Sequence, residues 1–177
     1  GNYTIRLKMD DQAKTTEGKI VAMPTYSTTP AQYAEYHGFM TDMETRLTDM
    51  HHTVNKLRKA QGQLKAIIKD VGDASLKEAG ETLLKSLDAW DGEMVQRKSK
   101  AYDDVENFPN KFSAEYLFLI DATNSTIPRV NQPSKDRKVE LDAQWNGLKA
   151  KAKELIETAI PAYNKKLWDA GIGAIRI

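Results

Sequence analysis

Apolar residues recur at intervals of four and three along one long segment of the chain, residues 36–71. This spacing places their side chains on a single stripe of one helix. Only Gln61 interrupts the apolar series. A helix of roughly 40 residues is about 60 Å long and cannot cover such a stripe by itself, so other helices are expected to run alongside it. The stripe consists of Tyr36, Met40, Met43, Leu47, Met50, Val54, Leu57, Gln61, Leu64, Ile68 and Val71.

A strong helix start precedes this stripe. Thr29 is a good N-cap, Pro30 suits the first helical position, and Gln32 stands where a capping box needs its partner. Gly72 follows the last stripe residue and favours an end there. The pattern predicts a first helix over residues 30–71.

Two further helices are expected between residues 75 and 122. Ser75 and Glu78 form a second capping box, which opens a second helix predicted over residues 75–107. Pro109 stops that helix, because proline lacks an N–H and restricts the residue before it. A shorter third helix is predicted over residues 110–122.

A fourth helix follows a proline-containing linker, residues 124–133. Ser134 is its expected cap. Pro161 lies inside the apolar pattern and should kink the helix, and Gly171 should end it. The stripe of this helix is Leu141, Trp145, Leu148, Ala152, Leu155, Ala159 and Ala162.

The first residues of the chain alternate in the manner of a half-buried strand. Tyr3, Ile5 and Leu7 are apolar and their neighbours are polar. A polar segment over residues 10–19 reads as a loose loop, and residues 20–23 read as a second strand. A lone hairpin is marginal in water. It must therefore pack on the helices, pair with another chain, or belong to a larger sheet.

Together these elements predict an all-α fold: an antiparallel three- to four-helix bundle with long helices, preceded by a short N-terminal β-hairpin. Neighbouring helices should cross at about 20°. Residues 1–27 form the hairpin, or the end of a truncated sandwich-like domain, and residues 28–177 form the bundle. The third helix is either a full bundle member or a cap on one end. The opening in mid-strand suggests a fragment of a longer protein.

Composition narrows the choice of function classes. Of 177 residues, 26 are Lys or Arg and 25 are Asp or Glu, and the signs are interspersed, whereas nucleic-acid binders gather basic charge on one face. The absence of cysteine excludes disulfides and thiolate metal sites. No apolar run reaches the ~18 residues of a membrane span. We expect neither a nucleic-acid partner nor a membrane span.

The three histidines do not form a recognisable metal site. A helical ligand pair needs a spacing of three or four residues, but His51 and His52 are adjacent and point about 100° apart. The position four residues after His52 is Lys56, and His37 lies far from both in sequence. Solvated or core-edge histidines are therefore expected.

Carboxylate pairs are the other candidates for chemistry. Asp103 and Asp104, or Glu154 and Glu157, could supply an acid and a base, but catalytic carboxylates need environments that separate their pKa values. These four lie on charged faces. No glycine-rich phosphate loop, G-x-S-x-G or H-E-x-x-H motif occurs. We predict no catalytic, cofactor-binding or metal residue, and no cofactor.

Two features of the first stripe admit two interpretations. Met40, Met43 and Met50 could line an adaptable binding groove, but their periodicity favours core filling. Gln61 is either a buried polar residue that fixes helix register or a residue at the solvent edge of the stripe.

Several stretches resemble the C-terminal region of bacterial β-propeller proteins of the BNR/Asp-box, sortilin-like "glycosyl hydrolase" type, which are abundant in Bacteroidetes. The opening GNYTIRL is similar to the strand that precedes the helical tail in that family. The other similar stretches are residues 48–58, 92–96, 107–112, 160–167 and 170–172.

The resemblance implies a non-catalytic accessory domain of a secreted, periplasmic or cell-envelope protein, with the upstream domains of the same chain as partners. The hydrolase label of the family belongs to its propeller, and no Asp-box motif occurs in these 177 residues. The alternative is a free-standing coiled-coil adaptor that homo-oligomerises through its long first helix. An enzyme is the least favoured interpretation.

Overall fold

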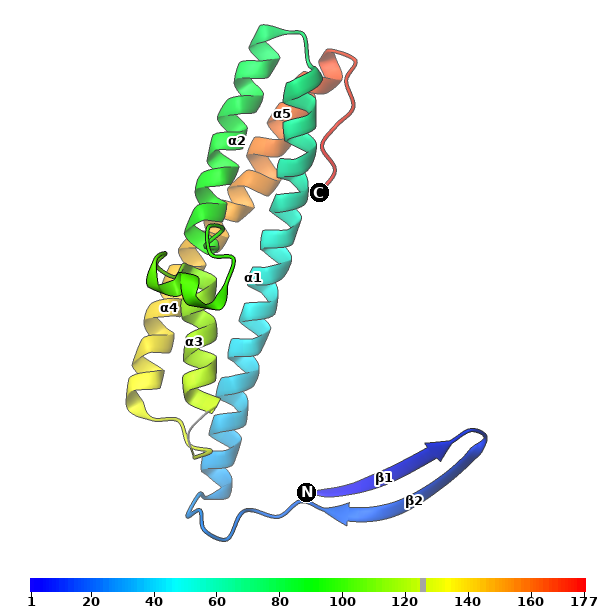
Figure 1. Cartoon of the computed structure of the whole chain (residues 1–177), viewed down its shortest axis with the longest axis vertical. Coiled ribbons are helices and arrows are strands. Elements are labelled where there is room, and N and C mark those ends of the chain that lie inside the picture. Colours follow the sequence, from blue (N-terminus) through cyan, green and yellow to red (C-terminus); the bar gives the residue numbers. More distant parts are fainter. Residues whose placement is uncertain (125–126) are drawn as a thin grey trace.

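The computed structural model describes residues 1–124 and 127–177, and it is mostly helical with an antiparallel β-hairpin at the N-terminus (Figure 1). Its elements are β1 (Asn2–Met9), β2 (Gln12–Lys19), α1 (Pro30–Asp70), α2 (Ala74–Met94), the 3-10 turn η1 (Tyr102–Glu106), α3 (Phe112–Asn124), α4 (Gln132–Glu154), the π turn η2 (Leu155–Ala159) and α5 (Ile160–Asp169).

The long first helix forms as predicted, because its capping signals are satisfied. The Thr29 hydroxyl accepts a hydrogen bond from the Gln32 backbone N–H at 3.2 Å, and the Gln32 side chain accepts one from the Thr29 N–H at 2.9 Å. Pro30 occupies the first turn and Val71 is the C-cap. The helix is 41 residues long, so it runs the full length of the helical part.

The helices from Pro30 onward, here called the helical body, are arranged in three columns (Figure 1). The first column is α1. The second is α2 followed by α3, and the third is the continuous run of α4, η2 and α5. The Ser113 hydroxyl donates to the Met94 carbonyl at 2.8 Å, so α3 begins where α2 ends. The short third helix therefore extends the second column along α1.

The apolar stripes of the three columns meet in one core. Trp90 on α2 donates its indole N–H to the Leu148 carbonyl of α4 at 2.8 Å, which satisfies the buried N–H. Phe112 stacks on Trp145 with ring centroids 6.2 Å apart. The largest fully buried side chains are Trp145, Tyr116, Met43, Met50, Leu57, Leu64, Leu87, Met94, Leu141, Ile160, Leu167 and Thr123.

The second helix is shorter than predicted: it ends at Met94, not at Asn107. Val95 has extended backbone angles, φ −135° and ψ 132°. Beyond it, Arg97 makes two hydrogen bonds back to Asp91, at 2.9 and 2.6 Å, and this pair turns the chain away from the helix axis. Residues 95–111 form an excursion between α2 and α3.

Two predicted helix caps are replaced by earlier residues. The cap of α2 is Asp73, whose carboxylate accepts the Leu76 N–H at 2.8 Å, and not Ser75. The cap of α4 is Asn131, whose side chain accepts the Ser134 N–H at 2.7 Å. Asp and Asn are at least as good caps as Ser. The predicted linker ahead of α4 includes residues 125–126, which lie outside the described residues.

Pro161 is accommodated by a π turn. Proline has no N–H, and its ring excludes the carbonyl four residues earlier. The Ile160 N–H donates to the Leu155 carbonyl, five residues back, which widens the helix just before the proline. The third column thus continues from α4 into α5.

The second strand of the hairpin lies earlier in the chain than expected. Asp10, with φ 51°, and Asp11 form a two-residue turn, since Asp tolerates the left-handed region. The polar segment expected to be a loop is the strand β2, and the prediction of a second strand at residues 20–23 is wrong. Ile20 alone of that segment pairs, with Gly1.

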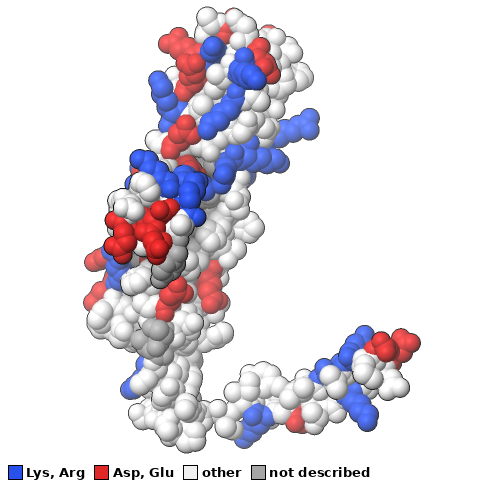
Figure 2. All heavy atoms as spheres, in the orientation of Figure 1, with Lys and Arg blue, Asp and Glu red and all other residues white. Residues whose placement is uncertain are grey.

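Basic and acidic side chains both cover the visible face of the helical body (Figure 2). Neither sign of charge covers this face alone. Among the described residues, no helix is both long and apolar enough to cross a membrane.

Candidate functional site

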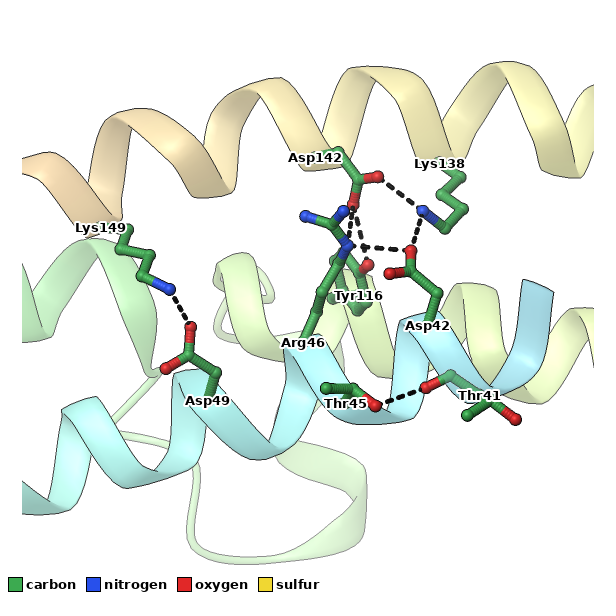
Figure 3. A network of polar contacts seen from close by, with 9 residues as sticks. All are labelled: Thr41, Asp42, Thr45, Arg46, Asp49, Tyr116, Lys138, Asp142 and Lys149. Carbon is green, nitrogen blue, oxygen red and sulfur yellow. Dashed lines mark hydrogen bonds and ion pairs between the residues drawn. The ribbon is translucent and has the colours of Figure 1, made fainter. Parts of the chain in front are cut away.

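Five polar side chains from three helices converge in one cluster on the helical body (Figure 3). We call it the polar cluster. Asp42 and Arg46 lie one turn apart on α1, and Lys138 and Asp142 lie one turn apart on α4, because both pairs are four residues apart in sequence. Tyr116 reaches the cluster from α3.

The two cations of the cluster each contact both carboxylates. Lys138 Nζ lies 2.5 Å from Asp42 Oδ2 and 2.6 Å from Asp142 Oδ2. Arg46 Nε lies 2.9 Å from Asp42 Oδ2 and 3.6 Å from Asp142 Oδ1. The Tyr116 hydroxyl donates to Asp142 Oδ1 at 2.9 Å. The cluster therefore joins all three columns.

The surroundings favour the charged forms of Asp42 and Arg46 and the neutral form of Tyr116. The hydrogen bond from Lys138 lowers the pKa of Asp42, although partial burial opposes the shift. The hydrogen bond to Asp42 raises the pKa of Arg46. Burial, and then the hydrogen bond to Asp142, raise the pKa of Tyr116, so its phenol stays protonated.

The polar cluster is a set of ion pairs that connects helices. Its two positive and two negative charges compensate one another, and its tyrosine is a hydrogen-bond donor. A general acid or base works best when its pKa lies near neutral pH. The pKa of Asp42 is instead lowered, away from neutral pH. The arrangement binds helices to one another.

Other ion pairs repeat this connection between columns. Lys149 on α4 lies 2.6 Å from Asp49 on α1 (Figure 3). Lys151 lies 3.0 Å from Glu93 on α2. These pairs are half exposed and therefore contribute little stability each, but they connect α4 to both α1 and α2.

The three histidines are all exposed: His37, His51 and His52. Among the described residues, no group of three or more His, Asp or Glu side chains is placed to hold a metal ion.

The carboxylates singled out in the sequence have local roles. Asp104 accepts the backbone N–H groups of Lys100 and Ala101, at 2.5 and 2.9 Å, and these bonds lower its pKa. Glu157 lies 3.7 Å from Lys153 on the preceding turn. Asp104 and Glu157 thus have their partners within four residues along the chain.

The unusual residues of the first stripe lie in the core. Met40, Met43 and Met50 are buried there, as the periodicity predicted. Gln61 is also buried, and its amide donates to Asp88 Oδ1 on α2 at 3.1 Å. Gln61 is thus buried, as one of the two interpretations expected, although its partner Asp88 is half exposed. The role of Gln61 in fixing helix register stays a prediction.

A surface depression of about 470 Å³ lies where α2, α3 and α4 meet. Its charged residues include Lys151 and Glu93, which are paired with each other. Its lining is Glu93, Asn110, Lys111, Phe112, Glu115, Gln144, Gly147, Leu148 and Lys151.

A row of exposed apolar side chains lies on the hairpin, which projects from one end of the helical body (Figure 1). Tyr3, Ile5, Leu7 and Met9 share one face of β1, because they alternate along the strand, and are 53% to 72% exposed. Three more exposed apolar residues follow β2: Ile20, Val21 and Met23. The alternation of β1 predicted this face, but not its exposure.

Comparisons with known proteins add no relative: no family model, no curated protein and no solved structure matches the chain.

Proposed function

We propose that this chain is a non-catalytic accessory module, built as an antiparallel helical bundle, that packs against a β-rich domain of the same secreted or envelope polypeptide through its N-terminal hairpin. The exposed apolar face of β1 is the observation that carries the proposal. Monomeric proteins rarely leave contiguous apolar patches uncovered. The resemblance to the helical tail of propeller proteins supports an upstream β domain as the partner.

The backbone of the hairpin supports the same partner. Gly1 and Ile20 exchange both of their N–H···O bonds, at 2.8 and 2.9 Å. Bonded and non-bonded pairs alternate along an antiparallel ladder, so the N–H and C=O groups of Asn2, Thr4 and Arg6 face away from β2. That free edge can accept another strand.

The alternative function, self-association through the first helix, has less support. Its stripe is already covered within one chain, since Met43, Met50 and Leu64 are fully buried. A coiled coil between copies would first have to open the helical body.

The test uses the whole polypeptide that contains this chain. We expect its open reading frame to encode a β domain ahead of residue 1. Amine cross-linking followed by mass spectrometry should join Lys8, Lys14 or Lys19 of the hairpin to that domain. The double substitution Ile5→Lys and Leu7→Lys should remove these links, because it places two charges in the apolar contact.

A matched control changes the opposite face of the hairpin. Thr4→Lys and Thr15→Lys add the same charge on the polar side and should leave the cross-links in place. An open reading frame without an upstream β domain contradicts the proposal. So do hairpin lysines that link only to the helical body or to a second copy.

A further inference from the structure

Residues 172–177 form an extended segment that folds back beside α1, and we call it the C-terminal tail (Figure 1). The reversal is made by Gly171, whose φ of 74° suits glycine. The Ile172 N–H donates to the Leu167 carbonyl at 2.8 Å, and the Gly171 N–H donates to the Trp168 carbonyl at 2.9 Å. This Schellman motif ends α5 and directs the tail toward α1.

Two side-chain amides hold the backbone of the tail. Asn164 on α5 accepts the Ile175 N–H at 2.8 Å and donates to the Ile175 carbonyl at 2.9 Å. Gln63 on α1 accepts the Arg176 N–H at 2.9 Å and donates to the Arg176 carbonyl at 2.7 Å. Each amide thus pairs with one residue as a neighbouring strand would. Such contacts do not depend on the side chain of the residue they hold.

One tail side chain enters the groove between α1 and α5. Ile175 is 3% exposed and belongs to the core, whereas Arg176 is exposed and Ile177 is 42% exposed. Beside the start of the tail, a hollow of about 300 Å³ lies between Ile172 and the last turns of α1. Its lining is mainly apolar: Ala66, Ile67, Asp70, Val71 and Ile172. The tail itself, through Ile172, forms one wall of this hollow.

We propose that the α1–α5 groove is a binding site for an extended peptide, and that the C-terminal tail is its resident occupant. The ligand is a strand-like segment with one branched aliphatic side chain in the place of Ile175. Its next residue lies outward, where a polar or basic side chain fits. Gln63 and Asn164 recognise the backbone, and the apolar pocket selects one side chain.

Tethering makes the tail a strong competitor, because a short linker gives it a high effective concentration. A peptide supplied from outside therefore binds well only when the tail is released. The groove is then open to a partner with the same chemistry, and the tail controls access to it.

The test uses the full chain and a fluorescent peptide with the sequence of residues 171–177. In the variant Ile175→Asp the tail should leave the groove, since a carboxylate cannot occupy the apolar pocket. We expect this variant to bind the peptide at least about tenfold more tightly than the unchanged chain does. Ile177→Asp, two residues along, should behave like the unchanged chain. A folded Ile175→Asp variant that binds the peptide no better overturns the proposal.

Backbone recognition is tested in the same variant. Adding Gln63→Met or Asn164→Leu removes two hydrogen bonds at similar volume and should weaken peptide binding about tenfold. Asn55→Leu, on an exposed position of α1, should not. Unchanged affinity in both amide variants overturns the role of the amides. If circular dichroism shows that Ile175→Asp unfolds the chain, Ile175→Ala replaces it and is judged by the same binding result.

Discussion

The carboxylate of Asp42 accepts hydrogen bonds from two cations, Arg46 on its own helix and Lys138 on α4. Its side chain is 46% exposed, whereas those of Lys138 and Asp142 are 14% and 18% exposed. Water therefore screens Asp42 more than it screens its partners. The charge of Asp42 still matters to both, because without it the cluster has an uncompensated cation.

The lowered pKa of Asp42 predicts how stability depends on pH. Its contribution is fully present above the unfolded-state value of 3.8 and is lost as the pH falls through the lower folded-state pKa. Asp42→Asn should therefore lower the free energy of unfolding at pH 7 by no more than about 1 kcal/mol, because the group is half exposed. Urea unfolding from pH 7 to pH 2 should show the two proteins converging at low pH. A difference that grows toward low pH contradicts this account.

Some of the polar contacts in this structure could be predicted from the sequence, and others could not. Asp42 with Arg46, and Lys138 with Asp142, have the four-residue spacing of helical ion pairs. Nothing in that spacing shows that the two pairs face each other. The contact between Gln63 and Arg176 joins residues 113 positions apart, and only the packed fold brings them together.

Within α2, one glycine is required by packing. A Cβ at Gly80 would lie 2.6 Å from the Tyr163 hydroxyl and 2.9 Å from Ile68 Cγ1. That hydroxyl donates to the Leu76 carbonyl at 3.2 Å, so α2 and α5 approach closely at this point. Gly92 on the same helix has open space around it.

Gly80→Ala should destabilise the chain by about 1–3 kcal/mol, because the added methyl group forces Tyr163 or Ile68 to move. Gly92→Ala should instead stabilise it by up to about 1 kcal/mol, because alanine is the better helix former. Chemical denaturation measures both.

Tyr163→Phe provides the second leg of a double-mutant cycle. Removing the hydroxyl should reduce the cost of Gly80→Ala. If Gly80→Ala is as harmless as Gly92→Ala, the close approach of α2 and α5 is wrong.

The elements that the sequence predicts well are those determined locally. Thr29 and Gln32 cap α1 through contacts three residues apart, and the four-three stripe is a property of one helix. The end of α2 depends on Arg97 folding back onto Asp91, a pairing six residues apart that propensity does not indicate. The hairpin register depends on the left-handed backbone of Asp10, which is a weak signal for Asp compared with glycine.

The whole molecule combines a buried core in the helical body with an exposed apolar face on the hairpin. Substitutions in these two places should change the stability of the helical body by different amounts. Leu57 is buried in the helical body, so Leu57→Ala should cost about 2–5 kcal/mol. The double substitution Ile5→Lys and Leu7→Lys alters two exposed residues and should change the stability of the helical body by less than about 0.5 kcal/mol. Thermal unfolding followed by the helical circular dichroism signal measures both. A comparable loss from the hairpin variant would mean that the hairpin packs on the helices, and its apolar face would then be unavailable to a partner domain.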